Sequence, residues 1–381
     1  MQDNGVFCSL AWTSLGMNPH GRVRACGRSK PNPNNPSLKD MSLEEAWNSD
    51  YYKNLRLDML NGVKNENCEK CYLQEKLNGK SKRLDYTSLG DLEKYKPYTT
   101  DDGTCSQPPK ALDIRVGNIC NLKCVHCWTG NSSKWYEDKM MLDKYENTTN
   151  YKFNNEWIED NSIWNYVKKN IDDIEKINVL GGEPFASKSH NKFIDWCVEN
   201  NKTNLQLYYV SNGTLLNETM IEKLKKFKNI RLGISFDAVK ELATFLRFPT
   251  KWQTLEKNLK NINDKLPNCY FNWTCYNLNI HALKDTMSYC RTHFPNIEFN
   301  LGDFVINPVH MSVQNLPIKY KEKLLDNLKD IPQAKFYLDY MMEKHTWNDQ
   351  SDILLSYLND LDKVRKTNWR NTLPEIAELY E

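Results

Sequence analysis

Short apolar runs alternate with amphipathic helical patterns from residue 111 to residue 304, and this alternation constrains the fold most strongly. Strands that are separated by helices usually pair in parallel, with right-handed crossovers. The pattern therefore predicts an α/β fold with a parallel sheet. Its six predicted strands cover residues 111–116, 176–180, 205–210, 230–236, 270–274 and 297–304, and its clearest helices cover residues 191–199, 218–227, 252–262 and 282–292.

The rest of the chain follows other patterns. Residues 1–78 are rich in cysteine, with a hairpin expected over residues 10–25, and Ser42 and Glu45 form a capping box that predicts the start of a helix. The expected organisation is a cysteine-rich module at residues 1–78, a linker at 79–110, an α/β barrel at 111–310 and a helical C-terminal extension at 311–381. Helices are expected in this extension at residues 318–331, 334–344, 352–366 and 374–381.

Charge and composition exclude several classes of protein. The 381 residues have a formal net charge of +2, and Lys and Arg are interspersed with Asp and Glu, which gives no signal for nucleic-acid or membrane binding. No apolar run approaches the roughly 20 residues of a membrane span, and the start does not resemble a signal peptide. The 12 cysteines therefore predict metal or catalytic use in a soluble cytoplasmic protein rather than disulfide bonds.

A compact cysteine motif directly follows the first predicted strand. Cys120, Cys124 and Cys127 can each bind one iron of a [4Fe–4S] cubane, which leaves the fourth iron open to an exogenous ligand. The alternatives are a zinc site and three buried thiols. Zinc sites favour four protein ligands in Cys-x-x-Cys pairs, and core cysteines have no reason to gather in one polar loop.

This spacing resembles the radical S-adenosylmethionine (SAM) superfamily, in which the amino and carboxylate groups of SAM occupy the open iron. Gly181, Gly182, Glu183 and Pro184 follow the second predicted strand and resemble the glycine-rich motif of the family, which binds the SAM amino group. Glycines allow the backbone to approach a ligand closely, and the Glu183 carboxylate suits an ammonium group. The resemblance implies a partial (β/α)6 barrel of the TIM type.

Positions at the ends of later strands also match the family. A serine and an arginine of SPASM and twitch members contact the SAM ribose and carboxylate, and an arginine can bind a carboxylate with two hydrogen bonds. Without the resemblance, Ser235 would be a strand-end hydroxyl and Arg247 a solvated helix residue. The SAM-binding positions that the resemblance implies here are Ser211, Asn212, Ser235, Arg247, Asn277 and His126.

A second group of cysteines lies in the N-terminal module. Cys8, Cys26, Cys68 and Cys71 resemble the twitch or SPASM module, which binds an auxiliary [4Fe–4S] cluster and normally follows the barrel, whereas here it precedes the barrel. The alternative is a structural zinc ribbon with the same four ligands. Cys105 is a spare candidate ligand.

Together these matches imply a radical SAM enzyme with SAM and two [4Fe–4S] clusters as cofactors. Such an enzyme cleaves SAM reductively to a 5′-deoxyadenosyl radical, which abstracts a hydrogen atom from a substrate. The expected partners are a peptide or small-molecule substrate and an electron donor such as flavodoxin or ferredoxin. The alternatives are a small-molecule dehydrogenase, a glycyl-radical activase and a non-catalytic zinc or iron–sulfur interaction protein. No residue is identified as a catalytic acid or base.

Overall fold

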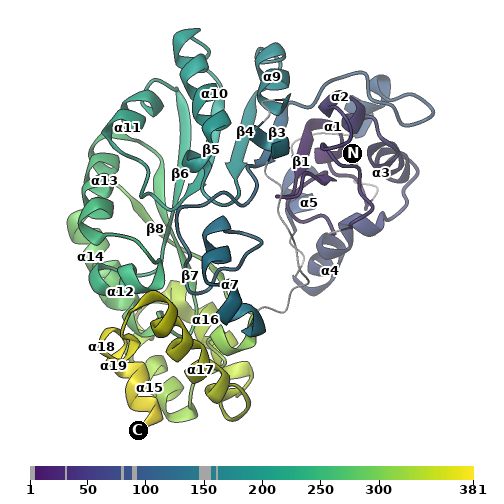
Figure 1. The fold of residues 1–381 in the computed structure, drawn as a ribbon. Helices are drawn as coiled ribbons and strands as arrows, with labels where there is room; N and C mark the ends of the chain where they lie inside the picture. The colour runs from purple at the N-terminus through teal and green to yellow at the C-terminus, as the bar shows by residue number, and fades with distance from the viewer. Residues whose placement is uncertain (1–4, 31, 79–80, 88–91, 146–155, 160–161) are drawn as a thin grey trace. The chain divides into compact units, whose positions relative to one another are not determined.

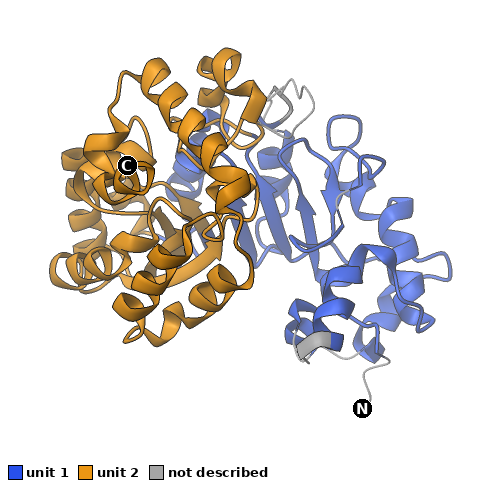
Figure 2. Ribbon diagram, turned by 90° about the horizontal axis from the view of Figure 1, so that it is seen from below, with its two compact units in different colours: residues 1–117, 153–208, 227–229 blue, residues 118–152, 209–226, 230–381 orange. Residues whose placement is uncertain are grey.

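The computed structural model describes residues 5–30, 32–78, 81–87, 92–145, 156–159 and 162–381. The chain forms two compact units, which Figure 2 shows in two colours. Unit 1 comprises Met1–Gly117, Phe153–Tyr208 and Phe227–Asn229, and unit 2 comprises Asn118–Lys152, Tyr209–Lys226 and Ile230–Glu381. The domain boundaries expected from the sequence stay a prediction.

Four strands of unit 1 lie side by side: β2 (Val23–Arg24), β1 (Ser14–Met17), β3 (Ala111–Arg115) and β4 (Lys176–Leu180). Strands β1 and β2 form the expected hairpin with antiparallel pairing. Residues 10–13, which were expected to belong to this hairpin, instead form helix α1 (Leu10–Thr13). Strand β1 also pairs in parallel with β3, and β3 pairs in parallel with β4.

Short helices surround these strands. Helix α2 (Leu43–Trp47) begins at the predicted capping box, because the Ser42 hydroxyl accepts a hydrogen bond from the Glu45 backbone and the Glu45 carboxylate accepts one from the Ser42 backbone. The other helices are α3 (Asp50–Leu60), α4 (Glu69–Asn78), α5 (Lys82–Thr87), α6 (Leu92–Tyr95), α8 (Glu156–Glu159), α9 (Ser162–Lys169) and α10 (Lys188–Glu199), with 3-10 turns η1 (Glu66–Cys68), η2 (Lys96–Tyr98) and η5 (Pro184–Ala186).

Strands β6 (Asn229–Phe236), β7 (Cys269–Cys275) and β8 (Glu298–Phe304) form the sheet of unit 2 with parallel pairing. Residues of β5 (Gln206–Ser211) fall in both units. The strand order is β2-β1-β3-β4-β5-β6-β7-β8. All six predicted strands are therefore present in the expected order, which confirms the α/β fold class.

Helices α11 (Glu218–Leu224), α13 (Trp252–Lys265) and α14 (Leu283–His293) lie along one side of the unit 2 strands (Figure 1). The predicted helical C-terminal region is also confirmed. The remaining helices of unit 2 are α7 (Lys139–Leu142), α12 (Lys240–Leu246), α15 (Ile318–Leu328), α16 (Lys335–Glu343), α17 (Trp347–Arg365), α18 (Trp369–Thr372) and α19 (Pro374–Ala377), with 3-10 turns η3 (Ser133–Glu137), η4 (Asp143–Tyr145), η6 (Ile280–Ala282), η7 (Val309–Met311), η8 (Pro332–Ala334) and η9 (Glu378–Tyr380).

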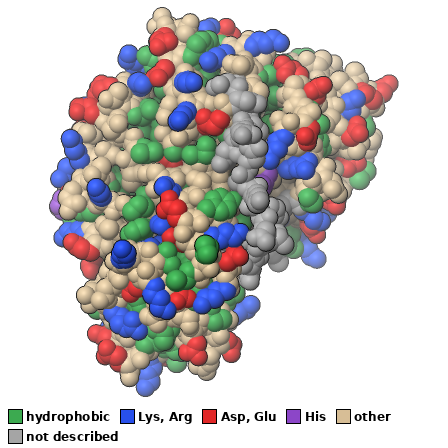
Figure 3. Space-filling model, viewed as in Figure 1, with side chains coloured by type: hydrophobic (Ala, Val, Ile, Leu, Met, Phe, Trp, Pro, Cys, Tyr) green, Lys and Arg blue, Asp and Glu red, His purple; other side chains and the backbone are tan. Residues whose placement is uncertain are grey.

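The core of unit 2 joins the ends of its strands to the C-terminal helices. Trp273 of β7, Leu358 of α17 and Trp369 of α18 are fully buried in one continuous hydrophobic cluster. The C-terminal helices are therefore part of the core of unit 2 rather than a separate appendage. On the face that Figure 3 shows, acidic and basic side chains are interspersed. Among the described residues, no helix has the length and apolar character needed to span a membrane.

Candidate active site

The three cysteines of the first motif lie in the loop that follows β3. Cys124 is buried, and Cys120 and Cys127 are half-buried. Burial raises the pKa of the Cys127 thiol well above its usual value of 9.0, and the charges of Cys124 and Cys120 raise it further. Cys127 therefore lies close enough to both Cys120 and Cys124 for their charges to act on it.

A cubane cluster fits this set of donors better than a single ion does. Within the described part of the chain, no group of three or more His, Cys, Asp or Glu side chains is arranged to hold one metal ion. In a cubane each thiolate binds a different iron, so the ligands need not converge on one point. The donor set of three thiols in one loop, Cys120, Cys124 and Cys127, fits a [4Fe–4S] cluster with one open iron.

Backbone hydrogen bonds to the end of α12 hold the cysteine loop in place. The Lys123 amide donates to the Phe248 carbonyl at 2.7 Å, and the Val125 amide donates to the Leu246 carbonyl at 2.8 Å. The Asn118 side chain donates to the Thr129 carbonyl at 2.8 Å and closes the base of the loop. The shape of the loop is thus set by main-chain contacts on both sides of Cys124.

A buried carboxylate next to this loop was not identified from the sequence. Asp237 follows β6 and accepts hydrogen bonds from Arg247 at 2.9 Å and from the Tyr276 hydroxyl at 3.2 Å. His126 Nδ1 lies 3.6 Å from the same carboxylate oxygen. Burial acts to lower the pKa of Arg247, but the combined effects of Asp237, Cys124 and Tyr276 exceed it, so the pKa is raised. Arg247 is therefore a buried cation, not the solvated helix residue that its sequence alone allows.

The position of Arg247 places its charge near the cysteine loop. Burial raises the pKa of the Cys124 thiol, and the Arg247 guanidinium is the strongest opposing influence. Ser235 lies half-buried near the end of β6, two residues before Asp237. Arg247 directly follows the last residue of α12. The SAM contacts expected of Ser235 and Arg247 stay predictions.

Asparagine side chains fix two other loops of unit 2. The Asn212 amide donates to Asn121 Oδ1 at 2.9 Å and so joins the turn after β5 to the cysteine loop. Ser211 accepts a hydrogen bond from the Gly213 amide at 3.0 Å and shapes the same turn. Asn277 is buried and donates to the His310 carbonyl at 2.8 Å, which positions the segment after β8.

The glycine-rich motif lies in unit 1, after β4. Gly181 has φ of +127°, and a Cβ atom there would lie 2.8 Å from the Gly117 carbonyl oxygen. The Gly182 amide donates to this same oxygen at 3.1 Å. Glu183 is buried, and its carboxylate accepts a hydrogen bond from the Phe185 amide at the start of η5. Close packing of backbone on backbone thus explains the first glycine of the motif.

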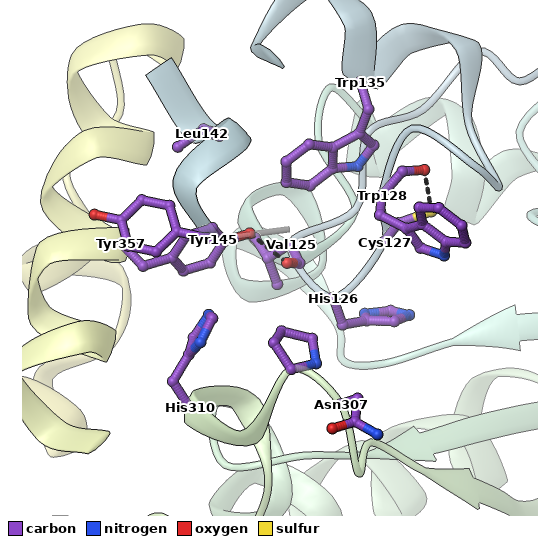
Figure 4. A pocket seen from close by; sticks show the side chains of 11 residues that line it. Val125, His126, Cys127, Trp128, Trp135, Leu142, Tyr145, Asn307, His310 and Tyr357 are labelled. Atoms are coloured by element: carbon purple, nitrogen blue, oxygen red, sulfur yellow. Dashed lines mark hydrogen bonds between the residues drawn. The ribbon is translucent and has the colours of Figure 1, made fainter. Parts of the chain in front are cut away.

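Unit 2 contains a cavity of about 490 Å³ beside the cysteine loop (Figure 4). Sequence reasoning identified His126 and Cys127 of its lining, but it missed rings such as Tyr145, His310 and Tyr357, which come from distant parts of the chain and carry no motif. The lining residues are Val125, His126, Cys127, Trp128, Trp135, Leu142, Tyr145, Asn307, Pro308, His310 and Tyr357.

Two histidines of the cavity are neutral at pH 7. Burial lowers the pKa of His310 to about 4, and burial also lowers the pKa of His126. The His310 ring packs against Tyr357, with ring centroids 5.1 Å apart. Its Nε2 atom is buried and makes no hydrogen bond within the described residues. The cavity therefore offers neutral hydrogen-bonding groups between aromatic rings.

The four cysteines of the N-terminal module also lie near one another, in unit 1. Burial raises the pKa of Cys8 and of Cys68 to about 12. The charges of Cys26 and Cys71 also raise both values. Cys105 instead donates to the Gln107 carbonyl and acts electrostatically on Arg56. The grouping of these four thiols suits a second cluster.

Comparisons with known proteins agree with this geometry. Residues 114–290 match the model of the radical SAM superfamily, and residues 8–72 match the SPASM iron–sulfur cluster-binding domain. The first model implies SAM and a [4Fe–4S] cluster as cofactors, and the second implies an auxiliary cluster. The unusual position of the auxiliary module, before the barrel in the sequence, is confirmed.

The curated relatives match only part of their own length. An uncharacterized protein of Methanocaldococcus jannaschii is 31% identical over 36% of this chain and 42% of its own. A GTP 3′,8-cyclase of Campylobacter lari is 27% identical over 42% of this chain and 44% of its own. The antilisterial bacteriocin subtilosin biosynthesis protein AlbA of Bacillus subtilis is 24% identical over 40% of this chain and 29% of its own. The chain thus spans less than half the length of these relatives.

Among solved structures, Streptococcus suis SuiB bound to S-adenosylmethionine aligns with a TM-score of 0.41 and 16% identity, over 74% of this chain and 64% of the SuiB chain. The two family matches show that the chain contains a radical SAM domain at residues 114–290 and, before it in the sequence, a SPASM iron–sulfur cluster-binding domain at residues 8–72.

Proposed function

We propose that this chain is a radical SAM enzyme that binds its catalytic cluster through Cys120, Cys124 and Cys127. The observation that carries the proposal is the grouping of these three thiols in one braced loop beside a cavity. When bound, the cluster and SAM supply one-electron cleavage of SAM and abstraction of a hydrogen atom from the substrate. The protein supplies the position of both ligands and keeps water out.

Each predicted SAM contact has a defined task in this proposal. The buried Glu183 carboxylate and the backbone of Gly182 receive the amino group of SAM after β4. Arg247 is oriented by Asp237, and its Nε makes no hydrogen bond within the described residues, which leaves a donor for the SAM carboxylate. Gly181 and Pro184 belong to the same glycine-rich motif for the amino group. Ser235 is proposed to contact the ribose, and Asn277 and His126 are proposed to lie near the adenosine. Ser211 and Asn212, in the turn after β5, are the remaining proposed SAM-binding residues.

The cavity beside Cys127 receives an uncharged part of the substrate. Its lining is mostly aromatic or apolar, and none of the described residues that line it is a Lys, Arg, Asp or Glu. Such a wall suits a peptide side chain better than the triphosphate of a nucleotide, which requires cationic partners. A peptide or protein substrate is also supported by the relative named for subtilosin biosynthesis.

A small-molecule substrate is the second candidate, and the relatedness to GTP 3′,8-cyclases favours it. The two substrate classes differ in the charge that the site must accept. Incubation of the reduced enzyme with GTP distinguishes them, because a cyclase consumes GTP while it forms 5′-deoxyadenosine. If the enzyme cleaves SAM but leaves GTP unchanged, a peptide substrate is supported over GTP.

The four thiols of unit 1 hold the auxiliary cluster in this proposal. Cys8, Cys26, Cys68 and Cys71 would complete the coordination of all four irons, so this cluster has no open site. It is suited to accept an electron from the substrate, with a ferredoxin or flavodoxin as the external donor of electrons to the enzyme.

Iron analysis and SAM cleavage test the proposal directly. Anaerobically reconstituted wild-type protein should bind about eight irons with labile sulfide and convert SAM to 5′-deoxyadenosine under dithionite. Cys124→Ala should lose about four irons and all SAM cleavage. Cys197→Ala is the matched control, because Cys197 is a fully buried cysteine of α10. Zinc without iron, or SAM cleavage that survives in Cys124→Ala, would refute the proposal.

A further inference from the structure

Helix α17 of the C-terminal region contacts the cysteine loop directly. The buried Tyr357 hydroxyl donates a hydrogen bond to the Val125 carbonyl, and Figure 4 shows both residues at the cavity. Eight residues further along the same helix, Arg365 is its last residue, and its side chain is also buried. Sequence analysis assigned no function to this helix, but its contacts place it beside the cysteine loop.

Arg365 belongs to a buried group of three charges. One oxygen of the Asp138 carboxylate accepts a hydrogen bond from Arg365 Nε at 2.8 Å, and the other accepts one from the Lys123 ammonium at 2.5 Å. The side chains of Asp138, Arg365 and Lys123 are only 1%, 2% and 10% exposed. Two cations and one carboxylate leave one net positive charge in the interior. Glu137 also approaches Lys123, at 3.3 Å, but it is 52% exposed and therefore strongly screened.

The rings that flank Arg365 are attached to the cysteine loop. The Arg365 guanidinium lies 5.0 Å from the Trp135 ring centroid and 5.3 Å from that of Phe248. Trp135 Nε1 donates to the Cys124 carbonyl at 3.1 Å, and the Phe248 carbonyl accepts from the Lys123 amide. Both Nη atoms of Arg365 are buried without a hydrogen bond to any described residue. Its charge is therefore weakly screened and close to Cys124.

The guanidinium of Arg365 thus lies beside the backbone of Cys124, because the Trp135 ring next to it is hydrogen-bonded to the Cys124 carbonyl. A positive charge that stabilises a thiolate also stabilises the more negative, reduced form of a cluster bound to that thiolate.

From these contacts we propose that Arg365 and Asp138 are positioning residues that set the reduction potential of the cluster at Cys124. Helix α17 is then the element that adjusts how readily the cluster accepts an electron. This inference rests on the proposed function, because it requires a cluster in the cysteine loop. It concerns neither SAM contacts nor the substrate.

The test is a redox titration of the full-length reconstituted protein, followed by EPR. The cluster in question is recognised by the signal that changes when SAM is added. Arg365→Met removes the positive charge and should shift the midpoint potential to a more negative value. Asp138→Asn removes the negative charge and should shift the potential in the opposite direction. Arg365→Lys keeps the charge and should stay near the wild-type potential.

Arg370→Met is the matched control. Arg370 is an exposed arginine of α18, and its guanidinium donates a hydrogen bond to the Asn359 side chain. Opposite shifts for Arg365→Met and Asp138→Asn support the proposal, because loss of packing alone has no reason to change sign with charge. If Arg365→Met does not fold, the Arg365→Lys and Asp138→Asn potentials decide alone.

The inference would be overturned by equal midpoint potentials in all variants, or by shifts of the same sign in Arg365→Met and Asp138→Asn. The proposed function would still stand in that case if the wild-type protein cleaves SAM. A wild-type protein with no SAM-sensitive EPR signal would overturn both.

Discussion

Replacement of Asp237 by asparagine should strongly destabilise unit 2. Asp237 is 0% exposed, and its partner Arg247 has a side chain that is 8% exposed. The amide of Asp237→Asn keeps the shape and one acceptor, but it leaves the Arg247 charge buried without its carboxylate partner. Removal of one partner of a buried pair typically costs about 3–5 kcal/mol. Because Tyr276 also donates to this carboxylate, we expect a loss in this range rather than below it.

Urea unfolding of the apo-protein, followed by tryptophan fluorescence and by far-UV circular dichroism, measures this loss. The control is Glu222→Gln, which removes a carboxylate from an exposed pair with Lys265 and should leave the unfolding curve unchanged. SAM binding by the folded Asp237→Asn holoprotein should also weaken, because Arg247 loses its orientation. A destabilisation below about 1 kcal/mol would show that Arg247 is solvated or paired elsewhere, and the description of this site would be wrong.

Three further predictions concern stability. Gly181→Ala should destabilise the protein by about 1–3 kcal/mol in urea unfolding, because its φ is +127° and the new Cβ would meet the Gly117 backbone. Arg56→Met should cost more than about 3 kcal/mol, since the fully buried guanidinium donates to three backbone carbonyls, among them that of Trp47; unchanged unfolding would refute this. His310→Gln should flatten the loss of stability between pH 6.5 and about 4. Burial keeps His310 neutral in the folded state, so wild-type stability is complete above pH 6.5 and falls as the unfolded chain takes up the proton, by roughly 3 kcal/mol. Parallel pH profiles for wild type and variant would contradict it.

The sheet could be predicted from the sequence because its strands are buried and carry local apolar patterns. The strand predicted at residues 176–180 is β4 (Lys176–Leu180), and the one predicted at residues 230–236 differs from β6 (Asn229–Phe236) by a single residue. The parallel pairing of β1 with β3 could not be predicted from local patterns, because it joins residues nearly a hundred positions apart. Short-range patterns carry no information on pairing over that distance.

The site was predictable only where a motif marks it. The cysteine loop and the glycine turn were found because their spacing is characteristic. Asp237, His310 and Tyr357 were not found, since each takes its role from burial and from partners distant in the sequence. An aspartate beside a strand end is usually solvated, and only the fold shows that this one faces a buried arginine.

The pairing of β1 with β3 bears on how this protein can be shortened. A fragment that begins after residue 78 would lack β1 and β2, so the edge of β3 would present unpaired amide and carbonyl groups to solvent. The native sheet ends instead on β2, whose two residues offer very little template for another chain. Attempts to express the part of the chain after residue 78 by itself should therefore give aggregated material, and co-expression of the missing N-terminal segment offers a way to keep it in solution.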